Sequence, residues 1–156
     1  MIRLSDGDIG ELLQEEKPLP SDFLTRIKTR PKRGHSEREL DLTGTGNSQF
    51  RVILRQSAVN HLDFSIILAY LPPNTNDMFR LRRHNGLSHE HTNIVEAQTF
   101  YDYHIHIATE RYQEIGARED AFAEPTDRYA DYASALRCFW ADCGFIFPPG
   151  AQSSML

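Results

Sequence analysis

The pattern of hydrophobic and polar positions changes along this chain from a helical period to a period of two, and then back again. From residue 35 onward, apolar residues recur at every second position, as expected of strands with one buried face. Clusters of Gly, Pro and Asn separate these segments and predict turns. The pattern predicts five strands, at residues 37–43, 50–55, 64–71, 78–83 and 100–109.

Helical spacing marks both ends of the chain. Ser5 suits the N-cap of a short helix that ends before Pro18, and Ser21 suits the N-cap of a second one. Thr126 suits the N-cap of a longer helix over residues 126–143. An apolar stripe predicts that this last helix packs on the sheet, and the stripe consists of Tyr129, Tyr132, Ala133, Leu136, Phe139, Trp140 and Cys143.

A run of strands between terminal helices favours the α+β class. We expect a mostly antiparallel five-stranded sheet connected as a meander, with short N-terminal helices and a long C-terminal helix packed on one face. The length of 156 residues fits a single domain, 1–156. Its parts are a helical N-terminal segment (1–34), the sheet (35–110) and the C-terminal helix (126–143).

Composition and charge exclude several classes of protein. With 40% apolar and 25% charged residues, the chain is neither disordered nor collagen-like. Its net charge of −5 argues against a surface coated with positive charge, although the basic runs at residues 26–33 and 80–83 can still form a local phosphate-binding patch. Cys138 and Cys143 lack metal-site spacing and are expected to be free thiols. The acidic N-terminus and the lack of a long apolar stretch predict a cytoplasmic protein without a membrane partner.

The candidate chemistry lies in the segment 84–111, which holds five of the seven histidines. The period of two in the last predicted strand puts His104 and His106 on one face with Asp102. His89 and His91 form a second H-x-H pair in the preceding loop. We therefore expect any chemical site to include His104 and His106.

Three interpretations of these histidines remain open. The first is a divalent transition metal held by His104 and His106 with a third ligand from Glu110 or from the preceding loop, because imidazoles two positions apart on a strand can reach one zinc, nickel or iron ion. This H-x-H-x-x-x-E spacing matches the opening half of the cupin metal motif, but the second half is absent. The second is metal-free cleavage of RNA by histidine acid–base catalysis, with nearby arginines stabilising the phosphorane. The third is a non-enzymatic protein contact, such as a homodimer interface.

The order of motifs also resembles a known group of proteins. A strand with the sequence FRLRRHNG at residues 79–86 precedes the H-x-H-x-N motif at 89–93, an aromatic-rich strand and a C-terminal helix. This order, over residues 50–143, is similar to that of small bacterial α+β proteins and, more distantly, of the ribonuclease-like toxins of type II toxin–antitoxin pairs. The resemblance implies action on RNA and a cognate antitoxin as partner. The chain has Arg83 and His84 where those toxins carry an aromatic residue and an acid.

The leading hypothesis is therefore a small ribonuclease-like toxin that acts on RNA without a cofactor. Its candidate catalytic residues are His104, His106, His89 and His91. Its candidate substrate-binding residues are Arg80, Arg82, Arg83 and Asn85. The alternatives are an interaction protein, as a homodimer or with another partner, and a histidine-ligated metal protein.

Overall fold

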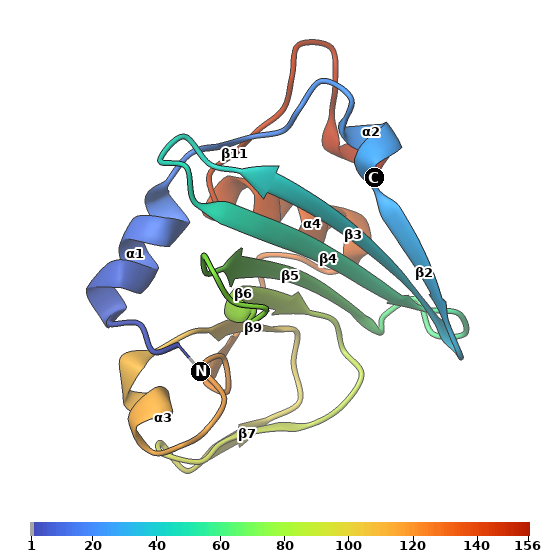
Figure 1. The fold of residues 1–156 in the computed structure, drawn as a ribbon. Helices are drawn as coiled ribbons and strands as arrows, with labels where there is room; N and C mark the ends of the chain where they lie inside the picture. Colours follow the sequence, from blue (N-terminus) through green and yellow to red (C-terminus); the bar gives the residue numbers. More distant parts are fainter. Residues whose placement is uncertain (1) are drawn as a thin grey trace.

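The computed structural model describes residues 2–156, and a seven-stranded antiparallel sheet forms its centre (Figure 1). The strand order is β10-β9-β6-β5-β4-β3-β2, and every neighbouring pair is antiparallel. The strands are β2 (Lys28–Lys32), β3 (His35–Thr43), β4 (Gln49–Ser57), β5 (Phe64–Leu71), β6 (Phe79–Asn85), β9 (His104–Ile107) and β10 (Ala123–Pro125). A small hairpin, β7 (His91–Asn93) with β8 (Gln98–Phe100), interrupts the chain between β6 and β9.

The mixed α/β architecture and the mostly antiparallel sheet confirm the coarse prediction, but the predicted number of five strands is wrong. The two strands that the pattern missed lie at the two edges. Strand β2 comes from the basic run and is exposed at every position, so it shows no alternation of apolar residues. Strand β10 has only three residues. Edge strands that bury no complete face leave little periodic signal in a sequence.

The prediction of a long C-terminal helix is also wrong. Helix α4 (Tyr132–Asp142) has 11 residues, and its N-cap is Asp131 rather than Thr126. The Asp131 carboxylate accepts a hydrogen bond from the Ser134 backbone N–H at 2.8 Å, and the Ser134 hydroxyl accepts one from the Asp131 backbone N–H at 3.2 Å. These two bonds form a capping box. The other helices are α1 (Asp6–Gln14), α2 (Phe23–Arg26), α3 (Glu110–Glu114) and the 3₁₀ turn η1 (Ser153–Met155). In residues 2–156, no helix is both long and apolar enough to span a bilayer.

The hydrophobic core lies between α4 and one face of the sheet. Ile66, Leu68 and Phe139 are fully buried there. Leu136 and Trp140 follow at helical spacing and turn the same side of α4 toward the sheet. Because this face is apolar, the polar residues that alternate along the strands collect on the opposite face.

A buried lysine ties the two ends of the chain to each other. Lys17 lies in β1 (Lys17–Pro18), which pairs with β11 (Phe145–Ile146), and is fully buried. Its ammonium donates to the carbonyl of Cys143 at 2.7 Å and to three carbonyls near the end of α1, those of Leu12, Leu13 and Glu15. Burial lowers its pKa from 10.5 to about 8, so the group keeps its charge at neutral pH.

We expect Lys17→Met to lower the free energy of unfolding by about 3 kcal/mol, because it leaves buried carbonyls without a donor. Denaturant unfolding measures this change. Lys28→Met, at an exposed position, is the matched control and should cost less than about 0.5 kcal/mol. Equal effects of the two substitutions would contradict this role of Lys17.

Candidate metal centre

Three histidines from two separate segments meet on the polar face of the sheet. One ring nitrogen from each of His91, His104 and His106 lies within 4.8 Å of the other two. The ring centroids are 5.4 Å apart for His91 and His104, 4.8 Å for His91 and His106, and 5.0 Å for His104 and His106. We call these three residues the histidine triad.

Two members of the triad owe their position to the strand period. His104 and His106 alternate with Ile105 on β9, so both point away from the apolar core. Across the ladder to β6, His104 pairs with Asn85 and His106 pairs with Arg83. Directly paired residues share a face of the sheet, so Arg83 and Asn85 lie beside the triad.

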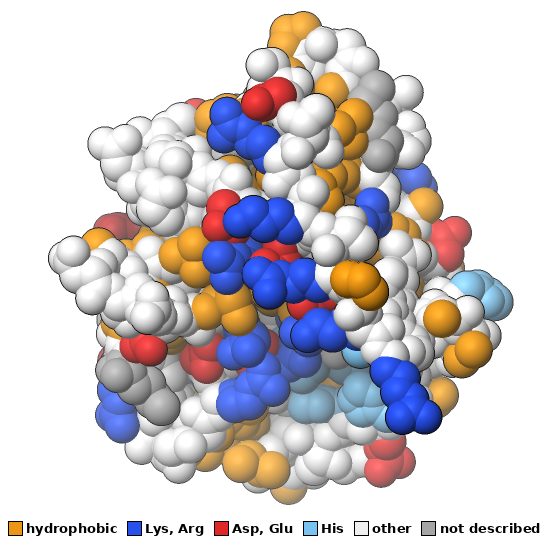
Figure 2. Space-filling view, turned by 45° about the vertical axis from the view of Figure 1, so that its right-hand side comes forward, with side chains coloured by type: hydrophobic (Ala, Val, Ile, Leu, Met, Phe, Trp, Pro, Cys, Tyr) orange, Lys and Arg blue, Asp and Glu red, His pale blue; other side chains and the backbone are white. Residues whose placement is uncertain are grey.

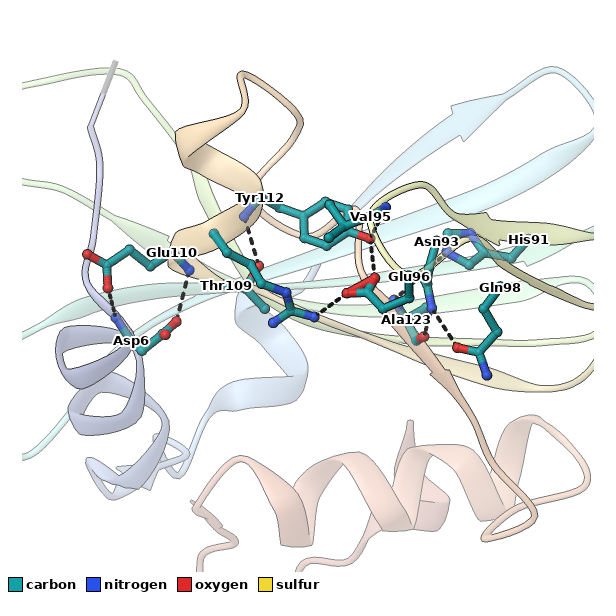
Figure 3. Close-up of polar contacts among 11 residues, drawn as sticks. Asp6, His91, Asn93, Val95, Glu96, Gln98, Thr109, Glu110, Tyr112 and Ala123 are labelled. Atoms are coloured by element: carbon teal, nitrogen blue, oxygen red, sulfur yellow. Dashed lines mark hydrogen bonds and ion pairs between the residues drawn. The ribbon is translucent and has the colours of Figure 1, made fainter.

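The third member, His91, depends on the β7–β8 hairpin, and Asn93 anchors this hairpin to the edge of the main sheet. The Asn93 amide nitrogen donates to the Ala123 carbonyl at 2.7 Å, and the Ala123 backbone N–H donates to Asn93 Oδ1 at 2.9 Å (Figure 3). This side chain is fully buried and pairs with β10 much as another strand would. The contact holds the end of β7 against β10, which itself pairs with β9.

The second ring nitrogen of each triad histidine donates to a fixed acceptor. His104 Nδ1 lies 2.8 Å from the Asp102 carbonyl, and His106 Nδ1 lies 2.7 Å from the Asp120 carbonyl. His91 Nε2 lies 2.8 Å from Asn93 Oδ1 (Figure 3). That oxygen is identified as the acceptor because the Ala123 N–H also donates to it. The lone pairs are thereby left on His91 Nδ1, His104 Nε2 and His106 Nε2.

Burial keeps the two strand histidines neutral at pH 7. Desolvation lowers the pKa of His104 from 6.5 to about 4, and the neighbouring His91 and His89 add to this. Desolvation, followed by the charge of Arg83, lowers the pKa of His106 to about 2. A neutral imidazole is the form that binds a metal ion.

The structure separates the other candidate residues of the sequence analysis. His89 is exposed, with its ring centroid 6.0 Å from that of His104. Glu110 begins α3, where its backbone N–H donates to the Asp6 carboxylate at 2.8 Å (Figure 3). It is not a member of the cluster formed by His91, His104 and His106. Of the two expected sources of a third ligand, the cluster thus contains His91 from the loop and not Glu110.

Only two of the four candidate substrate-binding residues lie beside the triad. The ladder shifts register between Leu68 and Ala69, and Arg82 then pairs with Leu68 and Ile107 on the side of α4. Arg80 pairs with Ala69 on the polar face, and its backbone N–H donates to Glu119 at 3.0 Å. Arg83 and Asn85 remain next to the histidines.

Asp120 is a site residue that the sequence did not reveal. It is fully buried, its carbonyl accepts from His106, and its carboxylate lies 3.1 Å from Arg83 Nη2. Asn93 was visible in the H-x-H-x-N motif, but its contact with Ala123 joins residues 30 apart in the chain. Local patterns contain no signal for either contact.

A second group, His84, Cys138 and Asp142, lies on the α4 side. Its carboxylate is already held by Arg128, with contacts of 2.9 and 2.7 Å, and it lies 3.1 Å from His84 Nε2. These donors lower the pKa of Asp142 despite its burial. We interpret this group as a structural contact between α4 and the sheet, in which Arg128 forms the ion pair with Asp142 and burial lowers the pKa of His84.

Comparisons with models of protein families, with curated proteins and with solved structures find no match to this chain. The resemblance to toxin components therefore stays a prediction. The function has to be inferred from the residues of the site.

The low pKa values of His104 and His106 predict that the metal-free protein loses stability in weak acid. The unfolded chain takes up protons near pH 6.5, whereas the folded chain does so only near pH 4 and below. The free energy of unfolding should therefore fall as the pH falls from 6.5 to 5, by about 1 to 2 kcal/mol for each histidine. Denaturant unfolding at several pH values measures this slope.

His106→Gln should flatten that slope, because it removes one of the two groups. The exposed His61 provides the matched control, and His61→Gln should keep the wild-type slope. An unchanged slope in His106→Gln would show that His106 is not held neutral by the fold.

Proposed function

We propose that this protein binds one divalent transition-metal ion through the histidine triad, and that the ion acts as a hydrolytic centre. Three histidines are a known ligand set of catalytic zinc sites, in which the fourth position is left for water or substrate. A metal ion at such a site lowers the pKa of its bound water and supplies a nucleophile near neutral pH.

The observation that carries this proposal is the hydrogen bond on the second nitrogen of every triad imidazole. Metal-binding histidines usually donate that N–H to a carboxylate, carbonyl or water, which fixes the tautomer and orients the ring. Here the acceptors are the Asp102 and Asp120 carbonyls and the Asn93 side-chain oxygen. The lone pairs of the other three ring nitrogens are left within the cluster, and that of His104 Nε2 lies 3.4 Å from the Asn85 amide nitrogen.

The spacing of the triad is compatible with a single ion. Zinc–nitrogen bonds of about 2.1 Å in a tetrahedral site put the nitrogens about 3.4 Å apart. One ring nitrogen of each triad histidine lies within 4.8 Å of the other two, so these atoms exceed the tetrahedral separation by no more than about 1.4 Å. Imidazole ligands suit zinc, copper, iron and nickel. The softest ions prefer thiolate ligands, and the triad contains none.

Metal-free acid–base cleavage of RNA, with the triad and His89 as acid and base, remains the second candidate. It draws support from Arg83, which lies next to the triad and can stabilise phosphorane charge. The pKa values weigh against it, because a catalytic acid or base works best with a pKa near the operating pH. With pKa values of about 4 and about 2, His104 and His106 are neutral imidazoles at pH 7, so neither is in the imidazolium form that a general acid needs. The cognate antitoxin and the homodimer contact stay predictions.

We expect the purified chain, without a histidine tag, to bind one zinc ion per molecule and to gain thermal stability when zinc is added. Calorimetric titration and elemental analysis measure the stoichiometry. His91→Gln, His104→Gln and His106→Gln should each abolish the site, and Asn93→Ala should weaken it about 10- to 100-fold by releasing His91.

The control for these variants is His61→Gln, which should bind zinc as the wild type does. Loss of binding on His61→Gln, or retention of full affinity in all three triad variants, would place the metal elsewhere.

A chelator separates the two candidate chemistries. If the protein cleaves unstructured RNA, the metal proposal expects cleavage to stop when a chelator is added and to return with zinc. Cleavage that resists the chelator but is lost in His104→Ala and His106→Ala would instead favour acid–base catalysis. A gel assay with labelled RNA makes this measurement.

A further inference from the structure

Asn85 places a hydrogen-bond donor next to His104 of the histidine triad. Its side chain is nearly buried, and its oxygen Oδ1 accepts from the Ser65 hydroxyl at 2.8 Å. The amide nitrogen Nδ2 therefore faces His104 Nε2, at 3.4 Å. That imidazole nitrogen is the one left free to bind the metal. Once a metal ion binds the lone pair of His104 Nε2, the Asn85 N–H needs another acceptor. The nearest acceptor would then be an oxygen bound to the metal.

Arg83 places a second donor beside the triad. It stands opposite His106 in the ladder, and its Nη2 pairs with the Asp120 carboxylate at 3.1 Å. Its Nε is buried and has no hydrogen-bond partner among residues 2–156. A buried guanidinium N–H without an acceptor is costly, so this atom also favours a ligand oxygen.

Basic residues outnumber acidic ones on the polar face of the sheet, although the chain carries a net charge of −5. Glu119 and Asp120, which lie outside the strands, pair with Arg80 and Arg83 on this face. In the strand register, seven basic residues share the face of His104 and His106 with only three acidic ones. Figure 2 shows Lys and Arg side chains in a band across the molecule, with acidic side chains among them and histidines beside the lower end. The basic residues are Lys28, Arg30, Lys32, Arg51, Arg55, Arg80 and Arg83.

A cavity opens on this face beside Ser65, the residue that orients Asn85. Its volume is about 490 Å³, and its lining includes Lys32, Arg33, His35 and Arg55. Glu37, which holds Arg55 at 2.6 Å, and Asp63 also line the cavity, so part of this charge is already neutralised. Arg33 has no ion pair among residues 2–156 and adds positive charge to the cavity. A ligand at the metal could extend into this space.

We propose that the open position of the metal centre binds a phosphoryl group, with one oxygen on the metal and others accepting from Asn85 Nδ2 and Arg83 Nε. This inference rests on the proposed metal centre. A phosphoryl group matches it because it offers several acceptor oxygens around one atom and carries the negative charge that the metal and this face attract. Free phosphate, a phosphate monoester and a phosphodiester share this chemistry.

The cobalt(II)-loaded full chain provides the test, because the visible absorption of cobalt(II) reports on its ligands. Inorganic phosphate should change the spectrum of the wild type in a saturable way, and acetate should do so much more weakly. Phenyl phosphate and bis(p-nitrophenyl) phosphate, added in separate titrations, distinguish a monoester from a diester as the preferred source. Tighter binding of either ester than of free phosphate would indicate that the cavity takes part.

Asn85→Ala and Arg83→Lys should each weaken phosphate binding about tenfold or more, which is the effect of losing one hydrogen bond to a charged group. Arg83→Lys keeps a cation for Asp120 but removes Nε. Ser65→Ala should give a smaller loss, because it only releases the orientation of Asn85. Asn76→Ala, at an exposed position, is the matched control and should bind phosphate like the wild type. The cobalt(II) spectrum without phosphate verifies that each variant keeps its metal site.

The outcomes separate the two proposals. Failure of the wild type to bind cobalt(II) or zinc overturns both the metal centre and the phosphoryl site. Normal cobalt(II) binding without a response to any of the three phosphate compounds overturns the phosphoryl site alone. So does a phosphate response that Asn85→Ala and Arg83→Lys leave at wild-type strength.

Discussion

The contact between the Asn93 side chain and the Ala123 backbone is the constraint on which the candidate site depends. Its two hydrogen bonds, of 2.7 and 2.9 Å, join the β7–β8 hairpin to the edge strand β10. The same amide oxygen accepts from His91 and fixes the tautomer of that imidazole. One buried side chain thereby decides both where His91 lies and which of its nitrogens is free. Without it, the polar face would present two histidines, which rarely suffice to hold a metal ion.

The two strand histidines complete the site at an energetic cost to the fold. His104 is fully buried and His106 nearly so, and desolvation lowers the pKa of both. Each donates one N–H to a carbonyl, which satisfies half of its hydrogen-bonding capacity, and the other nitrogen is directed toward the cluster. A bound metal ion would satisfy the remaining lone pairs together. In the proposed site, Arg83 and Asn85 would supply donors around the position that the metal leaves open.

The parts of this structure that follow from a local period could be predicted from the sequence. Alternation placed His104 and His106 on one face, and the four longest strands, β3 to β6, appear close to their predicted positions. The parts that depend on long-range contacts could not be predicted. His91 lies in a hairpin whose position is set by the contact of Asn93 with Ala123, 30 residues further along the chain. Glu110 lies against Asp6 instead, where its carboxylate accepts from the Asp6 backbone N–H and its own backbone N–H donates to the Asp6 carboxylate. A register shift at Leu68 moves Arg82 to the side of α4.

The identity of the atoms around a bound ion tests the central claim most directly. X-ray absorption at the zinc edge of the zinc-loaded protein measures these ligands and their distances. We expect three nitrogen ligands of the imidazole type at about 2.0 to 2.1 Å and one oxygen. A sulfur ligand at about 2.3 Å would assign the metal to Cys138 and its neighbours, and a shell of oxygens alone would indicate an adventitious surface site. Either result would contradict the histidine triad as the metal centre.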